Sequence, residues 1–408
     1  MFDKKITQSI SYGSLFLVPF LLLWTHNLSV LIIALISIYS IIYISYNRAI
    51  IKLERYDIIV IGMLSLYFII NIPNVIIDLG KLRYFQGGIR LLLCIPIYIF
   101  LRYQITSEDK AIDYISKGTI AGSIGALLMA IYQYFYLSFD RVDGYLFSIN
   151  FGYLAGSLAF LALTLAMQSK LKVWLYFSFV FSVVSLLLTY TRGAIFSIPI
   201  LLMFIIFLNY KKLSFKYVVL GASVLILSSV LMYKLSPSFK QRIDFTYNEF
   251  SLIASGHTEY SASAGGRLLL WKAATEGFKL SPFVGLTYSE RETLNQELYK
   301  QGEVTHWVTT VSRGHAHSQY FEMLVSNGVL GVIGAIGMLL APCIYFSKAY
   351  LRTHSPITLT ASVFLAAFCI FGLTEVLLQA NLISAFFGFM LAAFFAIWRN
   401  SSNYDKST

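Results

Sequence analysis

The chain has 408 residues, of which 57% are hydrophobic and only 12% are charged, and its formal net charge is +11. A soluble domain carries about 25% charged residues, so this composition predicts a protein that crosses a membrane many times. The basic excess is spread over short segments between apolar runs. This distribution is typical of membrane topology and argues against a nucleic-acid partner.

Apolar runs predict the membrane helices, because a helix needs about 20 apolar residues to span a bilayer. About twelve such runs occur, at residues 10–25, 28–46, 57–76, 87–103, 112–136, 148–168, 172–190, 194–210, 217–235, 328–347, 355–374 and 380–398. The fold class that we predict is therefore an all-α polytopic membrane protein. Lys4 and Lys5 precede the first run without a small-residue cleavage site after it, so we interpret this run as a retained helix.

The three cysteines, Cys94, Cys343 and Cys369, all lie inside apolar runs. We therefore expect neither a disulfide framework nor a cysteine metal site.

Loop charges predict the orientation, because cytoplasmic loops carry an excess of Lys and Arg. With the N-terminus inside, the cytoplasmic side receives Lys4, Lys5, Arg48, Lys52, Arg55, Arg102, Lys110, Lys170, Lys172, Lys211, Lys212, Lys216, Lys348, Arg352, Arg399 and Lys406. The short loops of the opposite side carry only Lys81, Arg83, Arg90, Arg141 and Arg192. Both termini are therefore predicted to be cytoplasmic.

The segment 236–317 is then outside the cytoplasm, and at about 80 residues it is far longer than an ordinary connection. Its sequence predicts an amphipathic helix that starts after Gly265-Gly266 and ends at Ser281-Pro282. We predict three parts: transmembrane helices 1–9 in residues 1–235, a helical cap outside the cytoplasm in 236–317, and a helix on the same outer surface with transmembrane helices 10–12 in 318–408.

Two histidines, His315 and His317, stand where this segment returns to the membrane. Ser318 is a good helix N-cap, and residues 319–327 are expected to form a surface helix that Gly328 closes. His317 would lie at the N-terminus of this helix, where N–H groups favour an anion and an imidazole can act as a base near neutral pH. The alternatives are a surface histidine and a His-x-His metal site.

Arginines on the same predicted side could hold an anion. Arg192 lies in a tight turn between two apolar runs, where an arginine is costly without a partner. We interpret it as a fixed cation suited to bidentate phosphate binding, with snorkelling to lipid headgroups as the alternative. Arg267 opens the cap helix, where a solvated helix face is the default. Arg90 and Arg141 are further candidates.

Glu375 is an acid at the outer end of a membrane helix and could pair with one of these arginines. No nucleotide-binding glycine motif occurs at a strand–helix junction. Because ATP and nucleotide sugars are absent outside the cytoplasm, a lipid diphosphate is the energy-rich donor that these residues suit.

At this point the sequence resembles the O-antigen ligase and polymerase family of bacterial envelope assembly. The family pattern of His, then Asn, Ser or Gln, nine residues and Gly-x-x-Gly matches from His317 to Gly331. Further elements match at Thr191–Ala194, Gly265–Trp271, Ser281–Gly285 and Gly372–Glu375. Order, spacing and predicted sidedness agree across roughly residues 140–376.

The resemblance implies a C-type glycosyltransferase fold with a large periplasmic loop, in the bacterial inner membrane. It implies a metal-independent, cofactor-free transfer from an undecaprenyl-diphosphate-linked glycan. Carried over by position, Arg192 and Arg267 would bind the donor diphosphate, with Arg90 as a supporting contact. His317 would activate the acceptor hydroxyl for an inverting attack. The remaining candidates are His315 as a rival base, Arg141 and Glu375.

Members of this family differ in their acceptor. A ligase transfers finished O-antigen to lipid A–core, a polymerase extends the glycan on its lipid carrier, and an oligosaccharyltransferase modifies protein. The size of the chain and its single long loop favour the ligase, with the polymerase second. A lipid-linked glycan transporter is the alternative of another class, but such folds show pseudo-repeats that this sequence lacks.

Overall fold

The computed structural model describes residues 3–167, 169–210, 230, 233–234, 237–256 and 264–401. Every regular element in this part of the chain is a helix, as the composition predicts. The chain divides into two compact units: unit 1 comprises Met1–Leu201 with Ile333–Thr408, and unit 2 comprises Leu202–Val332.

The first helices in chain order are α1 (Lys4–Phe20), α2 (Leu28–Asn47), α3 (Arg55–Ile69), α4 (Ile72–Ile77), η1 (Leu82–Phe85), α5 (Gln86–Leu92), α6 (Cys94–Gln104), α7 (Glu108–Ile131), η2 (Tyr132–Tyr136), α8 (Ser148–Ala166), α9 (Lys172–Leu187) and α10 (Arg192–Leu208). They are followed by α12 (Pro237–Ala254), α13 (Ala264–Leu280), α14 (Tyr288–Lys300), α15 (His306–Thr310), η4 (Ser312–Gly314), α16 (Gln319–Ala335), η5 (Ile336–Leu340), α17 (Ala341–Thr353), α18 (Pro356–Phe371), η6 (Leu377–Gln379) and α19 (Asn381–Asn400).

Seven helical stretches of the described residues are long and apolar enough to cross a membrane, each at a predicted run: Leu28–Asn47, Arg55–Ile77, Leu82–Gln104, Glu108–Tyr136, Ser148–Ala166, Gln319–Thr353 and Asn381–Asn400. Three further runs form shorter apolar helices, at α9, α10 and α18. The first run forms α1, which begins at Lys4 rather than near residue 10. The predicted span 217–235 falls almost entirely outside the described residues. The protein is thus an all-helical multi-pass membrane protein, and a total of twelve crossings stays a prediction.

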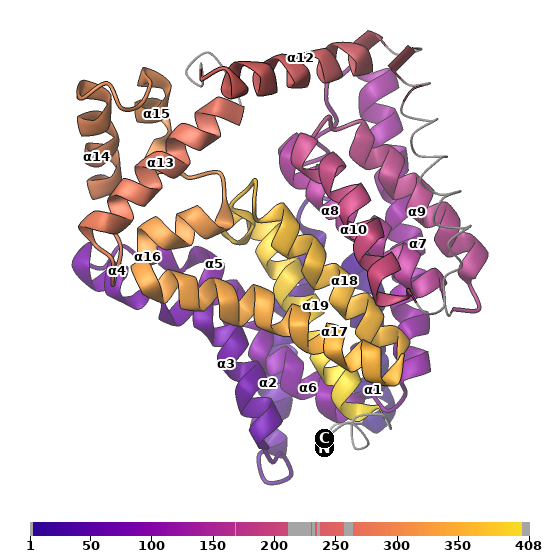
Figure 1. Ribbon diagram of the computed structural model, residues 1–408. Helices are drawn as coiled ribbons and strands as arrows, with labels where there is room; N and C mark the ends of the chain where they lie inside the picture. The colour runs from indigo at the N-terminus through magenta and orange to yellow at the C-terminus, as the bar shows by residue number, and fades with distance from the viewer. Residues whose placement is uncertain are drawn as a thin grey trace. The chain divides into compact units, whose positions relative to one another are not determined.

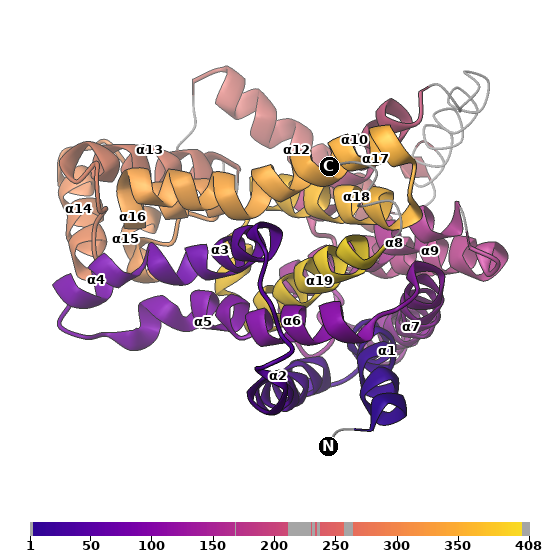
Figure 2. The same cartoon turned by 90° about the horizontal axis from the view of Figure 1, so that it is seen from below.

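The centre of unit 1 is formed by α8, α18 and α19. Of the apolar stretch long enough to cross a membrane, 94% is buried in α19 and 83% in α8, whereas only 28% is buried in α2. α18 packs on α8, and α19 runs beside α6 (Figure 2). α2 leaves most of its apolar surface exposed, as expected of a helix that faces lipid.

Unit 2 has its own small hydrophobic core, which α13, α14, α15 and the start of α16 surround (Figure 1). Its buried members are Leu270, Ala273, Ala274, Leu286, Leu294, Leu298, Val304, Val308 and Val325. A capping box between Thr287 and Glu290 starts α14.

The cap helix α13 ends at Leu280, directly before Ser281-Pro282 as predicted. It begins at Ala264, however, so both glycines lie inside the helix rather than before it. Gly266 is needed there because a Cβ atom would lie 2.7 Å from the ring of Trp307. The glycine therefore serves the close packing of α15 on α13 and not the start of the helix.

Candidate functional site

The two predicted histidines lie together in unit 2, on the turn between η4 and α16. Their ring centroids are 4.5 Å apart and the rings are nearly perpendicular. The backbone N–H of His317 donates a hydrogen bond of 3.3 Å to Nδ1 of His315. His317 has a φ of 48°, which is the left-handed region that side chains with a Cβ rarely adopt. Such a conformation persists only where the surroundings impose it.

Ala316, the residue between the two histidines, is held at both of its backbone polar groups. Its N–H donates to a carboxylate oxygen of Glu322 at 2.9 Å, and its carbonyl accepts the indole N–H of Trp271 at 3.1 Å. The Trp271 ring is itself stacked on Phe321, with centroids 4.9 Å apart. Both histidines are half-buried and flank this fixed point, so their backbone positions are set by α13 and α16.

A buried ion pair underlies the turn. Arg291 on α14 donates to both carboxylate oxygens of Glu322, at 2.7 and 2.9 Å, and the two side chains are only 2% and 3% exposed. Arg291 also donates to the Ser326 hydroxyl at 2.7 Å and to the carbonyl of Gly314. A buried charge pair is tolerated when its remaining hydrogen-bonding positions are filled. Here two of those hydrogen bonds are made with the backbone of the turn that carries the histidines, which we call the histidine turn. They involve the carbonyl of Gly314 and the N–H of Ala316, one on each side of His315.

Arg291 and Glu322 were not singled out in the sequence, although they organise the site. Arg291 stands between Glu290 and Glu292 in a polar helix, and therefore has the appearance of a solvated residue. Glu322 gave the better signal, because a single carboxylate inside an apolar stretch needs a partner. The sequence alone does not tell which cation provides it.

Arg267, the predicted diphosphate ligand of unit 2, lies on α13 and is half-buried. It stands four residues before Trp271, so the two share one face of the helix. Trp271 donates a hydrogen bond to the carbonyl of Ala316, so Arg267 lies on the face of α13 that contacts the histidine turn.

Two of the sequence motifs form the two sides of one backbone contact in unit 2. The N–H of Leu286 donates to the carbonyl of Val325 at 2.8 Å, and the N–H of Val329 donates to the carbonyl of Pro282 at 2.8 Å. The Ser281–Gly285 stretch is thereby tied to the Gly-x-x-Gly turn of α16.

Glycine is required on both sides of this contact. Gly285 has a φ of 76° and Gly328 a φ of 57°, so the helix predicted over 319–327 does end at Gly328 before a second helical stretch begins. A Cβ on Gly285 would lie 2.2 Å from the carbonyl carbon of Ser326, and one on Gly328 would lie 2.4 Å from the carbonyl oxygen of Pro282.

Gly285→Ala is therefore expected to destabilise the protein far more than a matched glycine change. Gly302 has the same φ of 76°, but a Cβ there would meet nothing within 4 Å. Gly302→Ala should cost only about 1 kcal/mol, the conformational penalty, whereas Gly285→Ala must also displace the backbone of α16 and should cost about 3 kcal/mol or more. Thermal unfolding of the purified protein measures both. Equal losses would contradict the close approach.

In unit 1, Arg192 begins α10 directly after a strained turn. Tyr190 has a φ of 51°, and the side chain of Arg141 donates through Nε to the carbonyl of Thr189 at 2.9 Å. Arg141 is therefore bonded to the turn that presents Arg192.

The Arg192 turn packs against the residue that precedes Glu375. A Cβ on Gly193 would lie 2.3 Å from Oγ1 of Thr374, so only glycine permits this approach. Glu375 is 8% exposed, and its carboxylate accepts the N–H of Val376 at 2.9 Å. Unit 1 thus brings Glu375 and the Arg192 turn into one neighbourhood.

Arg90, on α5, is half-buried with Nη1 3.5 Å from the hydroxyl of Ser384 on α19. The structure thus gathers the predicted residues into two groups: His315, His317 and Arg267 in unit 2, and Arg192, Arg141 and Glu375 in unit 1, with Arg90 also in unit 1. That the two groups meet over a common substrate stays a prediction.

The chemistry of the two groups is complementary. A half-buried imidazole on a fixed backbone can take a proton from a hydroxyl group, and guanidinium groups bind diphosphate oxygens in bidentate fashion. Nδ1 of His315 already accepts the N–H of His317, so a metal ion at the histidine pair would bind His315 through Nε2.

Comparison with known proteins gives two similarities. Residues 177–336 match the family model described as O-antigen ligase. The chain is also 25% identical, over 299 residues, to an uncharacterised protein of Haemophilus influenzae, and the match covers 71% of this chain and 72% of the relative. The family match includes Arg192, Arg267 and both histidines. It confirms the resemblance that the motifs predict.

Proposed function

We propose that the protein is an O-antigen ligase of the bacterial inner membrane, because residues 177–336 match the family model described as O-antigen ligase. It transfers a glycan from undecaprenyl diphosphate to a sugar hydroxyl of lipid A–core, on the periplasmic face and without a metal. The observation that supports this proposal most directly is the histidine turn, in which Ala316 is held through both its N–H and its carbonyl. A base held in this way needs little reorganisation in the transition state.

In the proposed reaction, His317 takes the proton of the acceptor hydroxyl as its oxygen attacks the anomeric carbon of the donor sugar. The bond between that carbon and the diphosphate oxygen breaks, and the configuration inverts. Arg192 and Arg267, supported by Arg90, bind the diphosphate and offset the charge that develops on the leaving group. His315 orients His317 through the hydrogen bond to its backbone. The products are the glycosylated acceptor and undecaprenyl diphosphate.

Arg141 and Glu375 have supporting roles in this proposal. Arg141 holds the turn before Arg192 through the carbonyl of Thr189. Glu375 lies beside Thr374, against which that turn packs, and its negative charge would balance the cluster of arginines when no diphosphate is bound.

The acceptor is tested by deleting the gene in its host, which keeps its own flippase, and restoring the wild-type copy. The lipopolysaccharide is then separated on a silver-stained gel, and the lipid-linked glycan is extracted in parallel. A ligase deletion leaves lipid A–core bare while long polymer accumulates on the lipid carrier, and the wild-type gene restores the ladder. If the deletion instead leaves lipid A–core with a single repeat unit, chain growth was lost, and the protein is the O-antigen polymerase.

A further inference from the structure

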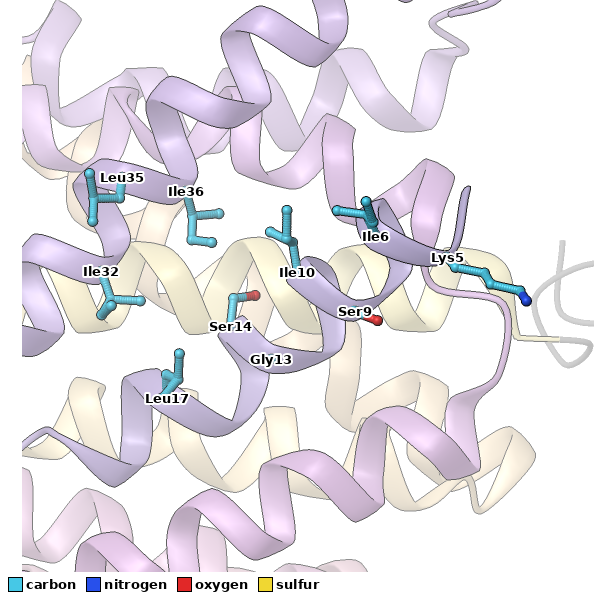
Figure 3. Close-up of a pocket in the computed structure, with 10 residues that line it drawn as sticks. All are labelled: Lys5, Ile6, Ser9, Ile10, Gly13, Ser14, Leu17, Ile32, Leu35 and Ile36. Atoms are coloured by element: carbon cyan, nitrogen blue, oxygen red, sulfur yellow. The ribbon is translucent and has the colours of Figure 1, made fainter. Parts of the chain in front are cut away.

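The apolar groove between α1 and α2 of unit 1 and the histidine turn of unit 2 differ in the charge that they present. Of the 10 residues that line the groove, Lys5 is the one with a charged side chain (Figure 3). The histidine turn has Arg267, Arg291 and Arg313 beside it. The proposed reaction gives Arg267 to the donor diphosphate, and Glu322 neutralises the charge of Arg291. Arg313 is the cation at this turn that the proposed reaction does not use.

The backbone of Arg313 is fixed in a conformation that suits glycine. Arg313 has a φ of 61° and a ψ of 16°, in the left-handed region that arginine rarely adopts. Its N–H donates to a carboxylate oxygen of Glu292 at 2.6 Å, and the carbonyl of the next residue, Gly314, accepts from Arg291. Side chains with a Cβ are destabilised in this conformation, and such strain concentrates at functional sites. Arginine at this position is therefore a candidate for binding a substrate.

The guanidinium of Arg313 lies over an aromatic ring and not against a carboxylate. Its central carbon is 5.6 Å from the centroid of the Tyr288 ring on α14. Glu292 stands one turn further along α14, but it bonds the backbone N–H of Arg313 and forms no ion pair with the guanidinium. Within the residues that the structure describes, no acceptor is hydrogen-bonded to this guanidinium. Its N–H donors are thus open to a ligand.

Arg313 lies close to the proposed base in the chain. It precedes His315 by two residues, so the two Cα atoms are at most about 7.6 Å apart. The ring of His315 is in turn 4.5 Å from the ring of His317, centroid to centroid. The long side chain of Arg313 can therefore contact a substituent on the sugar whose hydroxyl His317 activates, or on the adjacent sugar.

The two cations without a buried counter-charge approach the histidine turn from different helices. Arg267 lies on α13, which is bonded to the turn through Trp271. Arg313 is held against α14 instead. A transferase brings two substrates to one base, and the charge of the donor lies in its diphosphate. A second cation on another helix is suited to the other substrate, the acceptor.

The acidic groups near Arg313 leave room for an anionic ligand. The carboxylate of Glu322 is buried and is already bonded by Arg291 and by the N–H of Ala316. Glu292 is exposed, so water and salt screen its charge. A guanidinium binds phosphate and carboxylate groups through two parallel hydrogen bonds. The ligand chemistry that fits Arg313 is therefore an anionic substituent of one of these two kinds.

From this geometry we propose that Arg313 binds an anionic substituent, a phosphate or a carboxylate, on the acceptor glycan. The guanidinium stays on the ring of Tyr288 and donates two hydrogen bonds to the anion. Arg313 thereby selects an acceptor that carries negative charge next to the reacting hydroxyl. The inference rests on the proposed function, because it concerns the acceptor of that same site.

The test uses the full-length protein reconstituted in vesicles, with a lipid-linked glycan as donor and lipid A–core as acceptor. Initial rates give a KM for each substrate. The acceptor is supplied untreated, with its phosphates removed by hydrofluoric acid, or with its carboxylates converted to amides by carbodiimide and a neutral amine. The two treatments distinguish the two kinds of anion.

Arg313→Asn should raise the KM for the untreated acceptor about tenfold or more, the loss expected for hydrogen bonds to a charged group. The kcat and the KM for the donor should change little, because the lost contact is made equally in the ground state and in the transition state. Asparagine tolerates the left-handed backbone, so the variant should unfold at the wild-type temperature or above it.

One of the two treated acceptors should show the same raised KM with the wild type, and on that acceptor Arg313→Asn should lose nothing further. This acceptor identifies the anion. Lys300→Gln is the control, because it removes an exposed cation from the end of α14. It should leave the KM for every acceptor unchanged.

An unchanged KM for the acceptor in Arg313→Asn would overturn the inference, as would an equal loss on all forms of the acceptor. A rise confined to the KM for the donor would also overturn it, because Arg313 would then bind the diphosphate. These results differ from failure of the proposed function, in which the wild type itself transfers no glycan to lipid A–core and the inference falls with it.

Discussion

Alanine in place of His317 should abolish glycan transfer while leaving the protein in the membrane. Loss of a general base typically lowers the rate by about 10²- to 10⁴-fold, so no ladder of glycosylated lipid A–core should form and polymer should accumulate on its carrier. The measurement is complementation of the deletion strain, followed by turnover of purified enzyme with a lipid-linked donor. Full complementation by His317→Ala would remove this residue from the mechanism, whichever acceptor the enzyme uses.

Three further variants, each at a histidine, distinguish the loss of the proposed base from a change in the backbone of the turn. His317→Asn keeps a residue type that tolerates the left-handed φ of 48°, so it should preserve the turn and still lose activity. His315→Ala removes the hydrogen bond to the backbone of His317 and should reduce turnover less severely. His306→Ala is the control, because His306 is exposed on α15 and its ring packs against the ring of Tyr299.

Local features of the site could be predicted from the sequence. The break at Gly328 follows from the conformational freedom of glycine, and the end of α13 before Ser281-Pro282 follows from the proline. Each of these depends on residues close together in the chain, where steric rules act directly.

Long-range pairing could not be predicted in this way. The ion pair between Arg291 and Glu322 joins positions 31 residues apart, and neither side chain has a local pattern that names its partner. Gly266 shows the same limit: beside a second glycine it resembles a helix start, yet it lies within α13 because Trp307 packs against it. The sequence shows which residue type stands at such a position, but the contact that requires this type is made by a residue far away in the chain.

Glu322→Gln should destabilise unit 2 strongly, because it leaves the guanidinium of Arg291 buried without a counter-charge. Breaking a buried pair by removing one partner costs about 3–5 kcal/mol. Glutamine keeps the shape of the side chain, so the loss reports the charge rather than a cavity. Thermal unfolding of the purified protein measures it. Glu303→Gln is the control, since its pair with Lys272 is exposed on both sides, and no measurable change is expected.

Stability and positioning can be separated by replacing both partners. Arg291→Met combined with Glu322→Leu exchanges the buried charges for apolar groups of similar volume, which is often neutral for stability. The double variant should therefore regain much of the stability that Glu322→Gln loses. It cannot restore the hydrogen bonds to Gly314 and Ala316, however, because neither new side chain has a polar group.

Transfer activity should consequently stay low in the double variant, with turnover reduced and the KM for the lipid-linked donor little changed, since the arginines proposed to bind the diphosphate are untouched. Recovery of full activity together with stability would mean that the pair only holds unit 2 together. Stability without activity would mean that Arg291 and Glu322 position His317 through the backbone on either side of His315, which is the role that their hydrogen bonds predict.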